Sequence, residues 1–214
     1  MSVLRAFDMD GTLLAGSSAC LELARALGGA ADIEALDERF VRGEIDTRGY
    51  GRELVRLWPN LTPTVVADAF AASPWLTGIR EVCADIRRRG ERSAVVTMSP
   101  DFFANHLLAW GFDDVVASRF PPLPFAVPVD PTGILTPPDK VRIVQRLRAR
   151  HGIDTARCVA YGDSMSDAPL FRHLVATVGV NADTHLAGLA AAAYQGSDLA
   201  GAYALGRSLL AAAG

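Results

Sequence analysis

Hydrophobic residues near the start of the chain form one short block that only Arg5 interrupts. Residues 3–7 are mostly apolar and end at Asp8, which is the pattern of a buried β-strand. Asp10 and Gly11 follow, and glycine lets the chain leave a strand sharply. Two carboxylates this close repel each other and raise each other's pKa unless a cation lies between them. The segment is therefore either an ordinary turn or a strand end that binds a hard cation such as Mg²⁺.

The following segment, residues 15–73, has apolar side chains at helical spacing and no strand pattern. It predicts four helices, over 17–27, 32–42, 47–58 and 62–72. The spacing indicates a small all-helical cap domain inserted after the first strand. The remaining residues, 1–14 and 74–214, are predicted to form the core domain that carries the catalytic site.

From Ser73 onward, helix and strand patterns alternate. Helices are predicted over 75–89, 100–110, 138–150 and 166–174, and strands over 93–97, 114–118, 158–161 and 176–180. The Ala-rich segment 186–214 is interpreted as packed helix. This alternation predicts an α/β fold with a doubly wound parallel sheet, right-handed crossovers and helices on both faces. Ligands of such sheets bind at the carboxyl ends of the strands. The proline-rich segment Phe120 to Pro138 is either a flap near the site or a solvated excursion.

Composition narrows the possible partners. The net charge is -3, and the isoelectric point near 5.8 argues against binding to nucleic acid or to an anionic membrane. Three scattered cysteines form no zinc pattern and no disulfide framework, which fits a reducing cytoplasm. No signal peptide and no membrane span are expected. We expect a cytoplasmic monomer or homodimer.

Three further segments place polar residues at predicted strand ends. The second strand ends at Thr97-Met98-Ser99, and Pro100 is predicted to open a helix with Ser99 as its N-cap. A hydroxyl beside free backbone N–H groups forms an anion cradle, although the same residues can merely end a strand and cap a helix.

The other two segments carry Lys140 and a pair of aspartates. Lys140 is the only lysine in a chain that otherwise uses arginine, and it lies in the first turn of a predicted helix, where the helix dipole disfavours a cation. A compact ammonium that bridges a carboxylate and a phosphate would explain it, whereas a chance surface lysine is the alternative. Asp163 and Asp167 follow Gly162, the residue after the predicted strand 158–161, and in a helical turn they would share one face.

Together these segments resemble the four motifs of the haloacid dehalogenase superfamily of aspartate-nucleophile phosphatases, and within it the phosphoserine-phosphatase group. The resemblance implies that Asp8 is the nucleophile and that Asp10 is the general acid and base. It implies that Thr97 and Met98 hold the phosphate, with Ser99, Gly11 and Thr12 beside it, and that Lys140 neutralises charge. It also implies a Mg²⁺ site made by Asp8, Asp10, Asp163 and Asp167. Such chemistry requires an in-line nucleophile, a cation and several donors to the phosphoryl oxygens.

The type of reaction and the identity of the substrate are less well defined by the sequence than the catalytic residues are. Within the resembled superfamily, an acid two residues after the nucleophile implies hydrolysis. Relatives that cleave phosphonates use a second lysine in the cap, and this chain has none, so the resemblance excludes their Schiff-base chemistry. A phosphotransferase or mutase, or a non-catalytic binding protein, stays open. The resemblance places substrate contacts at Ser17, Arg52 and Arg56, but the family's glutamate after the first motif is missing. Leu54 stands where its cap arginine is expected. We therefore expect a small phosphomonoester, with phosphoserine possible but not favoured.

Overall fold

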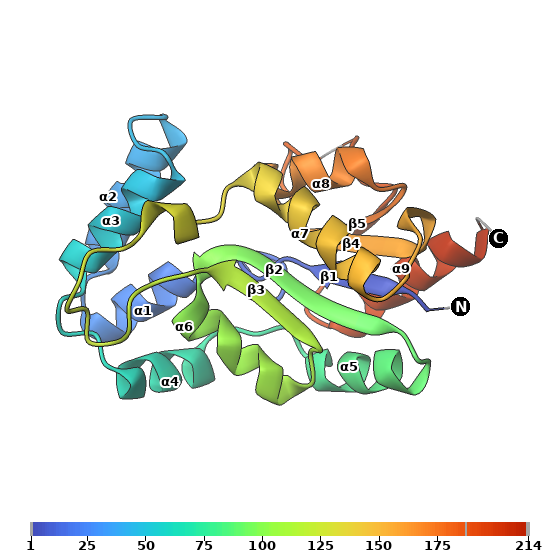
Figure 1. Ribbon diagram of the computed structural model, residues 1–214, viewed down its shortest axis with the longest axis horizontal. Coiled ribbons are helices and arrows are strands. Elements are labelled where there is room, and N and C mark those ends of the chain that lie inside the picture. Colours follow the sequence, from blue (N-terminus) through green and yellow to red (C-terminus); the bar gives the residue numbers. More distant parts are fainter. Residues whose placement is uncertain (1, 187, 213–214) are drawn as a thin grey trace.

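The protein is described here by a computed structural model covering residues 2–186 and 188–212. Its centre is a six-stranded parallel sheet in the order β3-β2-β1-β4-β5-β6 (Figure 1). The strands are β1 (Leu4–Phe7), β2 (Arg92–Pro100), β3 (Asp114–Ser118), β4 (Cys158–Gly162), β5 (Ala176–Val180) and β6 (Ala192–Tyr194). This confirms the predicted α/β fold class.

Helices cover both faces of the sheet because successive strand residues point to opposite sides. Leu4 and Ala6 of β1 pack with α7 (Pro137–Arg150) and α8 (Ala168–His173). Phe7 packs on the other face, which is covered by α5 (Ile79–Arg88) and α9 (Leu199–Ala212). Figure 1 shows α7 and α8 above the sheet and α5 below it. Burial on both faces explains why β1 is mostly apolar. Its one charged residue, Arg5, is buried and paired with Glu91 at 2.5 Å.

Four helices follow β1 directly: α1 (Ala19–Leu27), α2 (Ala30–Val41), α3 (Thr47–Leu57) and α4 (Pro63–Ala72). Ser18, Asp46 and Thr62 cap α1, α3 and α4 by accepting a backbone N–H bond. Figure 1 shows α1, α2 and α3 at one end of the molecule, next to the carboxyl end of β2. The four predicted helices are thus present. The boundary between cap and core remains a prediction.

Three predicted elements are wrong in their extent. The helix predicted over 75–89 begins only at Ile79, because Gly78 has φ +77° and Trp75 forms an antiparallel bridge with Leu14. The segment interpreted as helix from residue 186 contains the edge strand β6, and α9 begins at Leu199. The helix predicted over 100–110 is shorter, because α6 (Asp101–Ala104) passes directly into a 3₁₀ helix over 105–110.

The end of β2 contains a bulge that the sequence did not predict. Val96 pairs with Val116 and Pro100 pairs with Ser118, so three residues of β2 lie opposite a single residue of β3. Pro100 consequently ends the strand rather than opening a helix, and α6 has no side-chain cap. The prediction that Ser99 is an N-cap is therefore wrong. A bulge redirects side chains at a strand end, and here it redirects Thr97, Met98 and Ser99.

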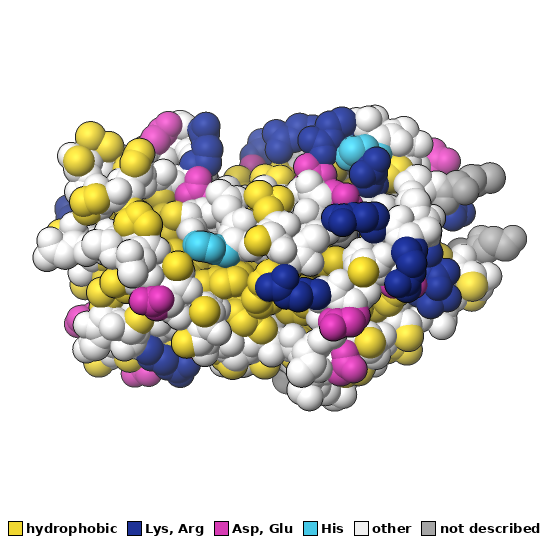
Figure 2. Space-filling model, turned by 90° about the horizontal axis from the view of Figure 1, so that it is seen from below, with side chains coloured by type: hydrophobic (Ala, Val, Ile, Leu, Met, Phe, Trp, Pro, Cys, Tyr) yellow, Lys and Arg dark blue, Asp and Glu magenta, His cyan; other side chains and the backbone are white. Residues whose placement is uncertain are grey.

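Within the described residues, no helix has the length and apolar character needed to cross a membrane. On the face shown in Figure 2, basic and acidic side chains both occur, and apolar surface is exposed between them.

Candidate active site

A buried ion network connects Lys140, in the first turn of α7, with carboxylates at the ends of two strands. The Nζ atom of Lys140 lies 2.9 Å from Oδ2 of Asp8 and 2.7 Å from Oδ1 of Asp167, and it also donates to Oγ of Ser166 at 3.0 Å. Lys140 is 1% exposed and Asp8 is 6% exposed. Burial alone would lower the pKa of Lys140, but the charges of Asp167 and Asp8 outweigh it and raise that pKa. Lys140 is therefore a fixed ammonium between two carboxylates.

Asp163 and Asp167 are held by the turn after β4. The backbone N–H of Asp163 donates to Oδ2 of Asp167 at 3.0 Å, and Thr12 donates its hydroxyl to Oδ1 of Asp163 at 3.0 Å. A Cβ atom on Gly162 would overlap the carboxylate of Asp167, so only glycine fits there. Both oxygens of Asp167 are thus engaged, one by Lys140 and one by this N–H group.

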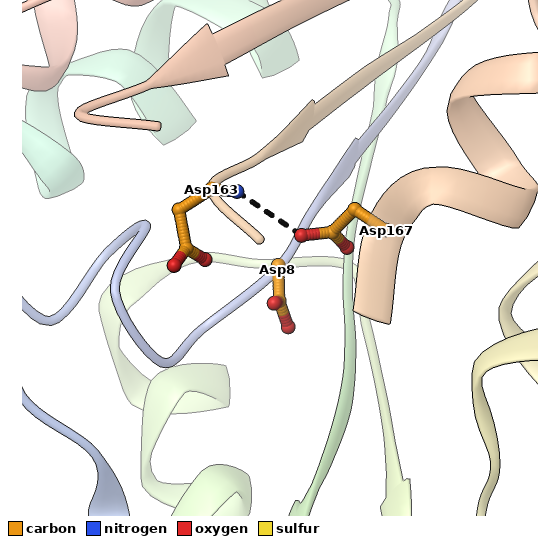
Figure 3. Close-up of side chains that lie close together, drawn as sticks. All are labelled: Asp8, Asp163 and Asp167. Atoms are coloured by element: carbon orange, nitrogen blue, oxygen red, sulfur yellow. Dashed lines mark hydrogen bonds between the residues drawn. The ribbon is translucent and has the colours of Figure 1, made fainter. Parts of the chain in front are cut away.

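The three carboxylates form a cluster suited to a hard cation. Asp8, Asp163 and Asp167 each offer an oxygen, and these oxygens lie within 4.8 Å of one another (Figure 3). Burial, followed by the charge of Asp167, raises the pKa of Asp8 well above its usual value, although Lys140 opposes this. The same two causes raise the pKa of Asp163 to about 7. A bound divalent cation with oxygen ligands would relieve this repulsion, so the residues fit Mg²⁺.

Asp10 is close to this cluster, but its side chain is held elsewhere. Oδ1 accepts the backbone N–H of Ala19 at 2.9 Å, and Oδ2 contacts the hydroxyl of Ser99. Burial raises the pKa of Asp10, while the bonds from Ser99 and Ala19 oppose that rise. The side chain of Asp10 is thus positioned by the start of α1 and by the β2 bulge, and Ser99 contacts an acid rather than capping a helix.

Two neighbouring cavities share part of their lining at Asp10. The first, which we call the reaction cavity, is lined by Asp8, Gly11, Thr97, Lys140 and Asp163. The second, which we call the cap cavity, lies against α2 and α3 and reaches Ser99 and Leu54. Asp10 and Met98 line both cavities. The two cavities are therefore adjacent, with Asp10 at their common border.

Of the three cap residues predicted to contact the substrate, one lines the reaction cavity and two lie away from it. Ser17 lines the reaction cavity, where its hydroxyl contacts the carboxylate of Glu22. Arg52 and Arg56 are exposed and line a separate hollow with residues 125–129, which belong to the proline-rich segment. Arg56 is paired with Glu53 at 3.1 Å. The structure therefore does not bring Arg52 or Arg56 together with Asp8.

Two cap residues were missed by the sequence analysis. Asp37 of α2 lines both cavities, and its Oδ1 accepts the hydroxyl of Tyr50 from α3 at 2.7 Å. A usable signal was present, because Asp37 lies on the helical face marked by the buried residues Ile33 and Leu36. Phe120 and Ile134 of the proline-rich segment also line the cap cavity. That segment therefore includes part of the cavity wall.

Gly11 offers a direct test of this packing. Gly11 has φ +72°, and a Cβ atom there would overlap the Asp163 carboxylate. Gly28 has φ +77° but no atom within 4 Å of a Cβ. We expect Gly28→Ala to lower the free energy of unfolding by about 1 kcal/mol through backbone strain alone. We expect Gly11→Ala to lower it by at least about 2 kcal/mol, because Asp163 must also move. Denaturant unfolding measures both, and equal losses would contradict the predicted clash.

The fold of this chain is similar to that of known proteins. The parallel sheet with polar residues at its strand ends is typical of doubly wound α/β proteins. The family model of haloacid dehalogenase-like hydrolases matches residues 6–172, and the chain belongs to this family. The predicted family and hydrolase class are thereby confirmed.

Several similar proteins carry the name phosphoserine phosphatase. The one from Archaeoglobus fulgidus is 26% identical over 82% of this chain and 52% of its own length. The one from Idiomarina loihiensis is 27% identical over 88% of this chain and 86% of its own length. A solved substrate-bound phosphoserine phosphatase has a TM-score of 0.78 at 22% identity, covering 94% of this chain and 96% of that one. This chain spans about half the length of the Archaeoglobus relative.

Proposed function

We propose that this protein is a Mg²⁺-dependent phosphomonoesterase that hydrolyses a small phosphorylated metabolite through an aspartyl phosphate on Asp8. The main support is the position of Asp10, which borders both the reaction cavity and the cap cavity. A phosphate beside Asp8 with its alcohol part in the cap cavity would place the bond to be broken next to Asp10. That is where a general acid must be.

In the proposed first step, Asp8 attacks phosphorus and the alkoxide leaves with a proton from Asp10. Lys140 holds Oδ2 of Asp8, so we assign the attack to Oδ1. Thr97 and the backbone N–H of Met98 would hold the phosphoryl oxygens beside Lys140. Burial raises the pKa of Asp10, which favours the protonated form that a general acid needs.

In the second step, Asp10 takes a proton from water, which attacks phosphorus, releases inorganic phosphate and regenerates Asp8. Asp8, Asp163 and the backbone carbonyl of Asp10 would hold Mg²⁺, with Asp167 behind Asp163. When bound, the metal would stabilise the negative charge on the phosphoryl oxygens. We also propose that the protein acts in the cytoplasm as a monomer or homodimer. The three cysteines in the described structure are free and buried, which suits a reducing compartment.

The reaction class can be tested with p-nitrophenyl phosphate, whose leaving group makes few demands on the pocket. We expect nitrophenol and inorganic phosphate to appear in equal amounts with Mg²⁺, and neither to appear after chelation with EDTA. A burst of nitrophenol without matching phosphate, followed by renewed nitrophenol release when an alcohol acceptor takes up the phosphoryl group, would instead indicate a phosphotransferase. A folded protein that binds Mg²⁺ and releases neither product would indicate a binding role.

A further inference from the structure

The cap cavity has apolar walls and a volume suited to a small group. Its volume is about 180 Å³, and its apolar wall includes Phe40, Leu54, Phe120 and Ile134. A cavity of about 150 Å³ accommodates benzene, so this one holds a group of roughly seven non-hydrogen atoms. A nucleoside or a hexose is larger than that. The geometry therefore favours a short alcohol over a sugar.

The charged side chains on this wall are acidic. Among the described residues that line the cap cavity, the charged ones are Asp10 and Asp37, and neither lysine nor arginine occurs. Asp37 is half-buried and accepts one bond, from Tyr50, at Oδ1. Burial raises the pKa of Asp37, although the bond from Tyr50 opposes that rise. A positive group would therefore favour the ionised form of Asp37, whereas a second carboxylate would be repelled.

Aromatic rings complete the cavity on the side of Asp37. The rings of Phe40 and Tyr50 are 5.8 Å apart at an interplanar angle of 75°, and Phe120 lines the same cavity. Rings attract an ammonium group over their faces and tolerate methyl groups on it. A carboxylate backed by aromatic rings thus suits a primary or a quaternary ammonium group.

We propose that the substrate is the phosphomonoester of a small amino alcohol that has an ammonium group and no carboxylate, with the ammonium group paired to Asp37. This proposal rests on the proposed phosphomonoesterase function and specifies its substrate class. It predicts that phosphoserine is a poor substrate, because its carboxylate would lie beside Asp10 and Asp37 with no cation on the cavity wall.

The test compares charged and neutral substrates of the same shape. Phosphocholine is paired with 3,3-dimethylbutyl phosphate, and phosphoethanolamine with n-propyl phosphate. We expect the wild-type enzyme to have a kcat/KM about 10- to 100-fold higher for the ammonium compound of at least one pair. The better pair identifies a quaternary or a primary ammonium group. Equal rates within both pairs, or phosphoserine as the best substrate, would overturn the proposal.

Substitution of Asp37 then tests whether this residue causes the preference for an ammonium group. We expect Asp37→Asn to lower kcat/KM for the preferred ammonium substrate by about 10- to 100-fold and to change that for its neutral partner less than about twofold. Asp32→Asn on the same helix, outside the cap cavity, is the matched control and should change neither. An equal loss on both substrates with Asp37→Asn would assign Asp37 a structural role and refute the pairing. If the wild-type enzyme turns over p-nitrophenyl phosphate, the phosphomonoesterase function stands whatever the ammonium substrates show. The comparison of substrates on the wild-type enzyme does not require any variant to fold.

Discussion

Asp8→Asn is expected to reduce Mg²⁺-dependent phosphate release by at least about 1,000-fold, which corresponds to about 4 kcal/mol of transition-state stabilisation. The amide cannot act as the attacking oxyanion, and it removes one charge from the acidic cluster. The substitution is nearly isosteric, and Asp8 is repelled by Asp167 and Asp163. We therefore expect the variant to stay folded and to be at least as stable as the wild type without metal.

The measurement is phosphate release at saturating Mg²⁺, accompanied by thermal unfolding. Asp183→Asn is a suitable control, because Asp183 lines the same cavity and is exposed, with its carboxylate bonded to the N–H of His185. The control should lose less than about tenfold. Activity that survives Asp8→Asn would rule out Asp8 as the nucleophile.

Lys140→Met is expected to impair both activity and folding. Removing one partner from a buried ion network leaves uncompensated charge, so we expect the free energy of unfolding without metal to fall by about 3 kcal/mol at neutral pH. We expect phosphate release to fall about 100- to 1,000-fold, because the phosphoryl group loses a fixed cation. Denaturant unfolding and steady-state kinetics measure the two effects separately.

Two further variants make this experiment specific. Arg142→Met on the same helix removes an exposed charge paired with Asp139, and it should cost less than about 1 kcal/mol. Combining Lys140→Met with Asp167→Asn removes one of the two stranded carboxylates and should restore part of the stability but none of the activity. If the double variant were no more stable than Lys140→Met alone, charge compensation would not be the reason for the loss.

The sheet was largely predictable because its strands are buried on both faces. A strand such as β1 then appears as an apolar block that ends abruptly at polar residues. The carboxyl ends of β1, β2 and β4 lie at one edge of the sheet by topology alone, so the joint position of Asp8, Thr97 and Asp163 could be inferred without coordinates. Lys140, in the first turn of α7, was assigned to the same site by the resemblance. β6 was missed because it is short and rich in alanine, and its pairing with β5 depends on tertiary context rather than propensity.

The cap side was less predictable for a different reason. Helical periodicity shows which face of a helix is apolar, but it does not show where that helix docks. Arg52 and Asp37 both lie in predicted cap helices, and only the packing of α2 and α3 places Asp37 in the cavity and Arg52 outside it. The bulge at the end of β2 likewise follows from its register with β3, which no local pattern encodes.

The central position of β1 has a consequence for how the protein acquires activity. β1 emerges first during synthesis, yet its two hydrogen-bonding neighbours are β2 and β4, and Leu4 pairs with both Arg92 and Cys158. Contacts so distant along the chain close late and slow folding. Asp8 can meet Asp163 only after β4 has been added beside β1. A nascent chain that lacks β4 therefore has the nucleophile but no complete metal site, and catalytic competence appears only near the end of folding.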